Sequence, residues 1–308
     1  EKHWNNMSEE ERGRRSAIAK ENWEKLSEAE RKEIQRKGSD ALRETIRDGS
    51  KAEKSLFNNL SKIGVTVFKR EEILKCIKSA NSLIITAPPN SYSCPIISNF
   101  GKDIVKSNIS WIGYLSSTSV YENHNGAEVT ELTKVAPKEE PGIFRYKAEQ
   151  DLKKLIINTS IKVEIFRVSG IYGLENNVFN QIKSGTINII YKKGHFFNRI
   201  HVSDISRVLS IAAIYGKNEG LVNLSDDCPA PQIDIFKYAY NLINLKIPEV
   251  NDYRDIKNSL KPSIRRFWDN NRRVNNNLLN ARYGPLIYPS YKKGLKNIYN
   301  LMTQTNNQ

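Results

Sequence analysis

The chain has 308 residues, of which 39% are hydrophobic and 27% charged, and this composition indicates a globular protein rather than a disordered or fibrous one. The length suffices for one large α/β domain with a small appendage. No apolar run approaches the roughly 18 residues of a membrane span, and the charged N-terminus is unlike a signal peptide. We therefore expect a cytoplasmic protein with no membrane partner. Cys76, Cys94 and Cys228 are isolated and lack metal spacing, so we expect buried, reduced thiols.

The net charge of +14 is unevenly distributed. Residues 1–54 carry 14 Lys and Arg against 13 Asp and Glu, whereas residues 254–308 carry 11 against 2. A basic C-terminal segment could attract phosphate-rich partners. The alternative is a compositional bias toward Lys, Asn and Ile along the whole chain, which implies no specific site.

The N-terminal segment contains an internal repeat. The pattern Trp4-x-x-Met7-Ser8-Glu9-x-Glu11-Arg12 recurs 19 residues later as Trp23-x-x-Leu26-Ser27-Glu28-x-Glu30-Arg31. In each copy a Ser is followed three residues later by a Glu, the spacing of a helix capping box. The sequence therefore predicts a charged helical repeat extension over residues 1–49. Residues 1–48 could contact nucleic acid as a small helical array, or pack as a charged extension onto the rest of the chain or a partner.

The remainder alternates short apolar strands with helices, which is typical of a parallel sheet wound by crossover helices. We expect strands at 64–68, 82–87, 110–116 and 161–166. We expect helices at 70–79, 95–107 and 204–215, at Asp234 to Asn244, and before residue 161 around Leu152, Leu155 and Ile156. The helix at 204–215, Asp234 to Asn244 and the Tyr283 to Tyr291 stretch are assigned to a smaller C-terminal lobe.

Two of the strands end abruptly in small polar residues. Trp111-Ile-Gly-Tyr-Leu is followed by four hydroxyl residues, Ser116 to Ser119, and the strand from Ser82 is followed by Thr86-Ala-Pro-Pro89. Ligands of open α/β sheets bind at the carboxyl edge of the strands. We therefore expect the two segments to lie side by side, with their polar ends at one binding edge. The alternative reading is a pair of core strands followed by polar turns.

Four segments in this order resemble one family: Tyr114-Leu-Ser-Ser-Thr-Ser-Val-Tyr121, Phe166-Arg-Val-Ser-Gly-Ile-Tyr-Gly173, Asn198-Arg-Ile-His-Val-Ser-Asp204 and Val222-Asn-Leu-Ser-Asp-Asp-Cys-Pro-Ala-Pro231. They resemble the extended short-chain dehydrogenase/reductase superfamily, the NAD-dependent epimerases and dehydratases, and most of all an atypical branch similar to the YeeZ-type proteins. The resemblance runs from about Ser50 to Leu301. It implies a Rossmann-like domain over residues 50–308 with a small C-terminal substrate lobe, NAD or NADP as cofactor, and a small-molecule substrate. A homodimer is a further expectation.

The sequence departs from that family at the cofactor loop. A Gly-x-Gly-x-x-Gly turn between the first strand and helix would hold the cofactor pyrophosphate, but Gly13, Gly38 and Gly49 lie in charged sequence without a strand. The acidic residue expected to read the ribose is also missing. The sequence therefore predicts a truncated Rossmann-like domain, in which the helical repeats stand in place of the first strand–loop–helix unit.

The catalytic residues of the family carry over only in part. The resemblance implies a Ser or Thr that orients the substrate oxygen, which matches Ser117 with Thr118 beside it, and a Tyr-x-x-x-Lys pair that transfers a proton. Counted back from Glu149, the Lys and Tyr positions hold Arg145 and Pro141. An Arg keeps the charge but does not share a proton as Lys does. The candidate catalytic residues are Ser117, Thr118, Tyr121, Arg145 and Tyr146.

The resemblance also suggests binding residues. Cofactor contacts are expected at the strand ends, at Thr86, Ala87, Pro88, Ser116, Arg167 and Gly170. Substrate contacts are expected at Tyr172, Arg199 and His201, with Arg199 able to hold a phosphate group, and we expect Asp204 to cap the following helix. Structural turns are the alternative reading of these positions.

Three functions remain open from the sequence. The first is an NAD(P)-dependent oxidoreductase or epimerase acting on a sugar-nucleotide-like or other hydroxyl substrate. The second is a catalytically inactive nucleotide- or ligand-binding protein that keeps the sheet and pocket. The third is a DNA-associated protein that acts through its N-terminal repeats.

Overall fold

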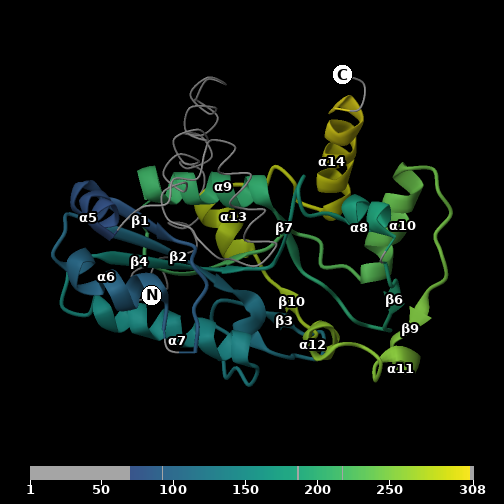
Figure 1. Ribbon diagram of the computed structural model, residues 1–308, viewed down its shortest axis with the longest axis horizontal. Helices are drawn as coiled ribbons and strands as arrows, with labels where there is room; N and C mark the ends of the chain where they lie inside the picture. Colours follow the sequence, from purple (N-terminus) through teal and green to yellow (C-terminus); the bar gives the residue numbers. More distant parts are fainter. Residues whose placement is uncertain (1–69, 92, 186, 217, 306–308) are drawn as a thin grey trace.

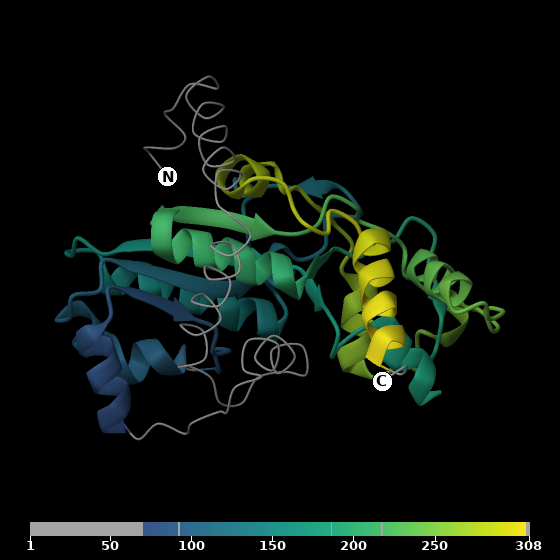
Figure 2. The same cartoon turned by 90° about the horizontal axis from the view of Figure 1, so that it is seen from above.

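The computed structural model describes residues 70–305 with the exception of residues 92, 186 and 217. The predicted repeat extension at 1–49, the domain boundary at residue 50 and the predicted strand at 64–68 lie outside the described residues. The described part is elongated, with a layered α/β body joined to a smaller lobe (Figures 1 and 2).

The body is built on a four-stranded parallel sheet of order β1-β2-β4-β8. Its strands are β1 (Ser82–Ile85), β2 (Trp111–Ser117), β4 (Lys162–Val168) and β8 (Gly220–Leu224). Strands β1 and β2 are direct neighbours, with Ile85 opposite Tyr114. This confirms the predicted α/β class and the pairing of the two strands whose ends carry polar residues.

Helices cover both faces of the sheet (Figure 2). On one face α5 (Arg70–Ser79), α6 (Pro95–Val105) and α7 (Glu140–Leu155) enclose a core around Ile85, Ile112 and Ile165. On the other face α9 (Val202–Ile211) and α13 (Asn277–Tyr283) enclose a core around Trp111 and Phe166. Successive strand residues alternate between the two cores, as the twofold repeat of a strand requires.

Helix α9 corrects one sequence prediction. Its residues, including Ile205 and Leu209, pack on the sheet, and so the predicted helix at 204–215 belongs to the body rather than to the C-terminal lobe. The last predicted turn is a π-helical segment, η2 (Ala212–Gly216).

A buried ion pair ties α13 to the sheet. Arg282 donates to Glu164 over 2.7 Å and the Tyr283 hydroxyl donates to the same carboxylate over 2.6 Å. Glu164 is fully buried in β4, and the carboxylate is therefore held by two partners from one helix. Removing either partner would leave an uncompensated buried group.

The smaller lobe follows the carboxyl end of the sheet. Strand β5 (Gly170–Tyr172) pairs with β7 (Arg199–His201), and a separate core joins α8 (Val178–Ser184), α10 (Gln232–Leu242) and α14 (Tyr291–Thr305). The remaining elements are β3 (Glu128–Val129) with β10 (Arg273–Val274), β6 (Ile190–Tyr191) with β9 (Asn251–Asp252), η1 (Thr118–Tyr121), α11 (Tyr253–Ile256) and α12 (Pro262–Asp269).

The cysteines agree only partly with expectation. All three are free thiols, but only Cys94 is buried, while Cys76 and Cys228 are half-buried.

Among the described residues, no helix combines the length and the apolar character that crossing a membrane requires.

Candidate functional site

The carboxyl edge of the sheet collects small hydroxyl residues. Thr86 follows β1, Ser117 ends β2 and Ser169 follows β4. Thr86 Oγ1 and Ser169 Oγ are buried and have no hydrogen-bond partner within the described part of the chain. Because a buried polar atom without a partner is costly, these two hydroxyls point to a ligand or water at this edge. Ala87 and Pro88, predicted beside them, are buried and half-buried.

A buried cluster lies just behind the edge. The guanidinium of Arg167 donates to both oxygens of Glu149, over 3.1 and 2.8 Å, and the Ser116 hydroxyl donates to Glu149 Oε1 over 2.5 Å. Ser116 and Arg167 are neighbours across β2 and β4, and Glu149 comes from α7. The two predicted cofactor contacts are thus brought together, but their polar atoms face a carboxylate of the protein itself.

Tyr121 lies against the same buried cluster. Its hydroxyl donates to Asn223 Oδ1 over 2.7 Å, and the Arg167 guanidinium lies 4.7 Å from its ring centroid. Asn223 stands opposite Arg167 in the neighbouring strand. Burial raises the pKa of Tyr121 to about 12, despite the nearby charge of Arg167. The side chain is 1% exposed, and its hydroxyl is occupied by a protein acceptor.

The other candidate catalytic residues surround the end of β2. Ser117 is half-buried, and its Oγ accepts the amide of Ser119, which caps η1. Thr118 is buried beside it, while Arg145 Nη1 donates 2.8 Å to the carbonyl of Leu115. Tyr146 packs against the cluster that contains Tyr121, whereas Lys147 is exposed. The two neighbours on α7 therefore point apart, as 3.6 residues per turn predict.

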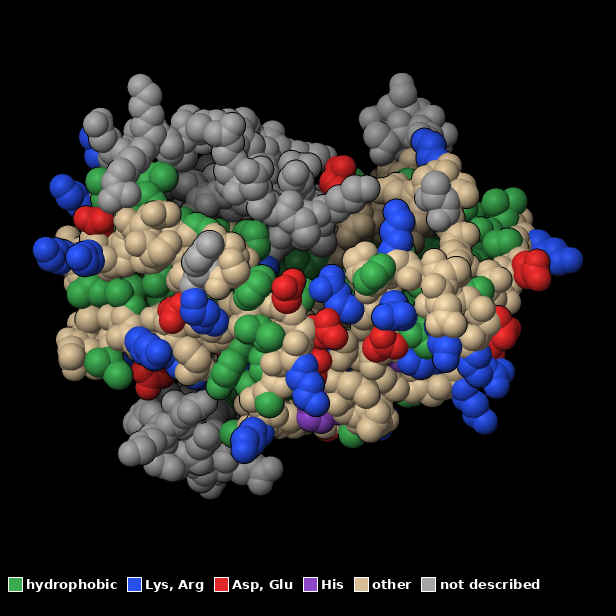
Figure 3. Space-filling model, turned by 60° about the horizontal axis from the view of Figure 1, so that its bottom comes forward, with side chains coloured by type: hydrophobic (Ala, Val, Ile, Leu, Met, Phe, Trp, Pro, Cys, Tyr) green, Lys and Arg blue, Asp and Glu red, His purple; other side chains and the backbone are tan. Residues whose placement is uncertain are grey.

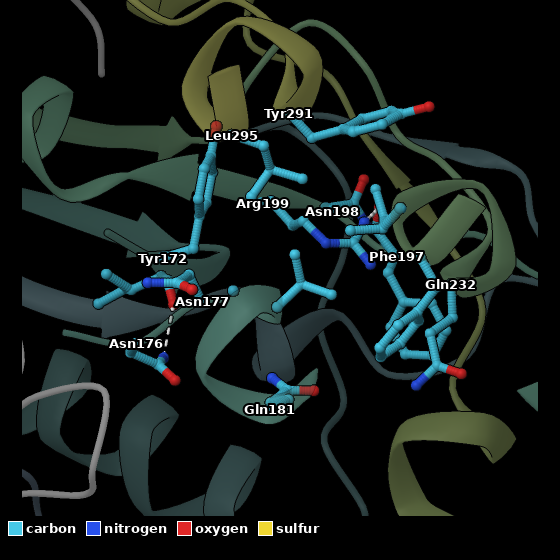
Figure 4. Close-up of a pocket in the computed structure, with 15 residues that line it drawn as sticks. Tyr172, Asn176, Asn177, Gln181, Phe197, Asn198, Arg199, Gln232, Tyr291 and Leu295 are labelled. Carbon is cyan, nitrogen blue, oxygen red and sulfur yellow. Dashed lines mark hydrogen bonds between the residues drawn. The ribbon is translucent and has the colours of Figure 1, made fainter. Parts of the chain in front are cut away.

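A cavity of about 210 Å³ lies beyond the carboxyl end of β4 (Figure 4). It brings together three predicted binding residues, Gly170, Tyr172 and Arg199. Figure 4 shows the Arg199 side chain reaching into the middle of the cavity, between the Tyr172 ring and Gln232. The polar wall consists of six side chains, Asn176, Asn177, Gln181, Asn198, Arg199 and Gln232.

The electrostatics of the cavity favour an anion. Arg199 Nη1 donates to the carbonyl of Phe197 over 3.0 Å and lies 3.4 Å from that of Ala230. Burial lowers the pKa of Arg199, and the charge of Asp226 partly offsets this. Burial also raises the pKa of Asp226 to about 7. None of the described lining residues is an Asp or a Glu, so no carboxylate competes for the guanidinium inside the cavity.

His201 lies outside the cavity lining. It is buried, packs on the rings of Tyr172 and Tyr288, and accepts the Ser203 amide through Nδ1. His201 is therefore the N-cap of α9. This corrects the prediction that Asp204 caps the helix: Asp204 instead accepts the amides of Ile287 and Tyr288 over 2.7 and 3.0 Å. Burial lowers the pKa of His201 to about 4, so its ring is neutral near pH 7.

Comparisons with known proteins place the chain. No family model and no curated protein matches the sequence. Among solved structures it is similar to a functionally unknown conserved protein from Silicibacter pomeroyi, at 34% identity and a TM-score of 0.68, over 72% of this chain and 78% of that one. The chain belongs to the family of this conserved protein.

More distant solved structures identify the fold of this family member. A human epimerase family protein, SDR39U1, with NADPH shares 13% identity over 82% of this chain and 96% of its own, with a TM-score of 0.64. A UDP-glucuronic acid 4-epimerase from Bacillus cereus in complex with NAD shares 15% identity over 86% and 88%, with a TM-score of 0.62. These neighbours confirm the predicted fold, that of the extended short-chain dehydrogenases/reductases.

The described edge of this short-chain dehydrogenase/reductase fold suits a dinucleotide in part. At the strand ends, Thr86 Oγ1 and Ser169 Oγ are buried and have no hydrogen-bond partner among the described residues. The pyrophosphate site of this fold lies at the first strand–helix turn. Residues 1–69 are outside the described part, so the fit concerns only the strand ends after β1, β2 and β4.

Sequence reasoning did not predict several residues of this site. Glu149 was used only to locate the expected Lys and Tyr positions, although its carboxylate accepts hydrogen bonds from Ser116 and Arg167. Gln181 and Gln232 lie in no motif, and Asn223 lies in the Val222–Pro231 segment that resembles the family but was assigned no role. The one available signal was that Asn223 is a polar residue within an apolar strand, which suggests a partner on the facing element.

Proposed function

We propose that the protein is an atypical NAD(P)-dependent oxidoreductase or epimerase that acts on a hydroxyl compound bound in the Arg199 cavity. The observation that supports this proposal is a polar cavity lined by Gly170, which directly follows Ser169 at the carboxyl edge of the sheet, where Ser169 and Thr86 carry buried hydroxyls without a described partner. Ligands of this fold class bind at that edge. Sugar nucleotides are one candidate substrate class, because one similar solved protein is a UDP-glucuronic acid 4-epimerase.

In this proposal the chain's own residues orient the two ligands. Thr86, Ala87, Pro88 and Gly170 form the wall beside the cofactor, and Ser116 and Arg167 stiffen that wall through Glu149. Ser117 and Thr118 hold the reacting oxygen of the substrate, and Tyr172 and Arg199 hold its body. A bound nicotinamide would supply hydride transfer.

A second candidate is a ligand-binding protein without catalysis, and specific observations favour it. Pro141 stands where the family resemblance expects the proton-transferring Tyr. Arg145 is engaged by the Leu115 carbonyl, and the Tyr121 hydroxyl is engaged by Asn223. A general acid or base must reach the proton it transfers, within about 3 Å or through one water.

Binding of NADH and NADPH, followed by nicotinamide fluorescence and thermal shift, tests both candidates. We expect a saturable signal with one of the two nucleotides. At a nucleotide concentration of one hundred times the Kd, binding should stabilise the folded protein by about 2.7 kcal/mol. Thr86→Val and Ser169→Ala should weaken binding, whereas Ser98→Ala, at an exposed position of α6, should not.

Turnover separates the candidates. A change in nicotinamide absorbance with a panel of hydroxyl compounds, UDP-glucose included, supports the oxidoreductase or epimerase. Saturable binding without any turnover across the panel supports the non-catalytic protein. If neither nucleotide binds, the oxidoreductase or epimerase is wrong, and only a protein that binds another ligand remains.

A further inference from the structure

The cavity presents one positive charge and no negative one. Arg199 has five N–H donors, and its described hydrogen bonds go to two main-chain carbonyls that share Nη1, while its guanidinium lies 5.6 Å from the Phe197 ring centroid. No ion pair of Arg199 occurs among residues 70–305 as described, although Asp226 lies near enough to affect its pKa. A half-buried guanidinium with spare donors suits the planar or forked oxygens of a carboxylate or phosphate.

The amides of the wall differ in their availability. Asn177 and Asn198 are engaged, because Asn177 bonds the 173–174 carbonyls and the Asn180 amide, and Asn198 bridges Arg272 and Val274. Gln232 uses only its Oε1, which accepts the Ile190 amide. The side-chain amide of Gln181 makes no hydrogen bond to another described residue, and Figure 4 shows this side chain at the lower side of the cavity. These free amide groups can donate to and accept from hydroxyls.

The size of the cavity limits its ligand. Its volume is about 210 Å³. Pockets that bury most of a drug-sized ligand span roughly 300–1,000 Å³. A nucleoside diphosphate sugar carries a base, two ribose- or hexose-sized rings and two phosphates, so the cavity encloses only a fraction of it.

We infer that the cavity is the specificity site for a compact hydroxy compound with a single anionic group, a monophosphate or a carboxylate, and not for a nucleoside diphosphate sugar. The anion lies against Arg199, and the hydroxyls meet Gln181 and Gln232. This inference rests on the proposed function and narrows its substrate class. The two anion sources share the recognition by the guanidinium, and the assay tells them apart.

Calorimetric titration of the full chain without any nicotinamide nucleotide tests the inference. The probes are inorganic phosphate, glucose 1-phosphate, glycerate, neutral glucose and UDP-glucose at constant ionic strength. We expect glucose 1-phosphate or glycerate to bind at least tenfold more tightly than glucose, and UDP-glucose to gain nothing over glucose 1-phosphate. Which of the two compact anions binds more tightly identifies the source of the charge.

Variants assign the binding to the cavity. Arg199→Gln should lower the affinity for the compact anions at least tenfold. Arg199→Lys keeps the charge but loses the forked donors, so its affinity should lie between those of the parent and Arg199→Gln. Gln181→Leu should weaken glucose 1-phosphate and leave inorganic phosphate unchanged. Lys193→Gln, an exposed residue outside the lining, is the control for net charge. Unchanged thermal unfolding shows that each variant is folded.

Two outcomes overturn the inference. One is equal anion binding by Arg199→Gln and the parent. The other is UDP-glucose binding at least tenfold more tightly than glucose 1-phosphate. The titrations contain no nicotinamide nucleotide, so a failure of the anion-binding prediction does not contradict the proposed cofactor. Equally, a failure to bind NADH does not by itself contradict anion binding in the cavity.

Discussion

Asp226 is a buried carboxyl whose ionisation is coupled to folding near neutral pH. It is 1% exposed, its Oδ1 accepts the Cys228 amide over 3.1 Å, and its Oδ2 has no partner among the described residues. Burial raises its pKa to about 7, while Arg199 opposes the rise and Asp227 and Asp204 add to it. Ionised Asp226 is therefore a cost to the folded state that the neutral form avoids.

The pH dependence of stability follows from that direction. The folded-state pKa exceeds the usual value of about 4, so the stabilising contribution of the protonated carboxyl is complete below about pH 4 and is lost as pH rises through 7. Asp226→Asn keeps an acceptor for the Cys228 amide and cannot ionise. We expect its free energy of unfolding, relative to the parent, to rise by roughly 2–4 kcal/mol between pH 4 and pH 8, measured by urea unfolding.

Asp255→Asn, which removes an equally negative but exposed side chain on α11, controls for net charge. Parallel stability curves for the parent and Asp226→Asn from pH 4 to pH 8 would contradict the prediction. They would show that the carboxylate is solvated or paired in solution.

At the scale of elements, α14 packs against β5 through a glycine. A Cβ placed on Gly294 would lie 2.2 Å from the Tyr172 hydroxyl and 2.7 Å from its ring. Ala is favoured over Gly within a helix by about 1 kcal/mol, but overpacking costs about 1–3 kcal/mol. We therefore expect Gly294→Ala to destabilise the protein by about 1–2 kcal/mol in chemical unfolding, because the contact outweighs helix propensity.

Gly101→Ala in α6 is the matched control. The nearest atoms to its added Cβ belong to the flexible Leu155 side chain, at 3.1 Å. This change should be neutral or stabilising. Pairing Gly294→Ala with Tyr172→Leu should recover part of the loss. If Gly294→Ala is as stable as the parent, α14 does not pack on Tyr172 at this distance.

The elements that sequence predicted are those whose signal is local. The helix expected at 70–79 is α5 with the same bounds, since its apolar residues recur on one face. The strands at 82–87 and 110–116 were predicted to within two residues, because apolar runs end in turns. By contrast, the two-residue strands β3 and β10 are defined only by each other, and no local pattern marks them.

The site was harder to predict because its parts are distant in sequence. Ser116 and Glu149 are 33 residues apart, and the cavity joins segments from Gly170 to Leu295. Family motifs predicted Arg199 and Tyr172, which line the cavity. They carried no information on Gln181 or Gln232, whose position depends on how α8 and α10 pack. The roles of all these residues stay predictions.

For the whole molecule, we propose that residues 1–49 form an extension separate from the Rossmann-like unit at 50–308. The homodimer likewise stays a prediction.

The distribution of charge bears on the nucleic-acid hypothesis. Figure 3 shows Lys and Arg side chains spread over one face and gathered most densely at its lower right. Residues 1–54 are nearly neutral, with 14 basic against 13 acidic residues. Helix α14 exposes Lys292, Lys293 and Lys296.

Nonspecific DNA binding should therefore follow the C-terminal part of the chain and not its repeats. Each phosphate contact contributes about 0.9 to the slope of log K against log salt concentration. We expect the triple change Lys292→Gln, Lys293→Gln and Lys296→Gln to lower that slope by up to about 2.7, measured by fluorescence anisotropy with a duplex of arbitrary sequence. Deleting residues 1–48 should leave the slope unchanged. If the deletion abolishes binding and the triple variant does not, this prediction is wrong. That result would support the hypothesis that residues 1–48 bind nucleic acid, although their net charge is close to zero.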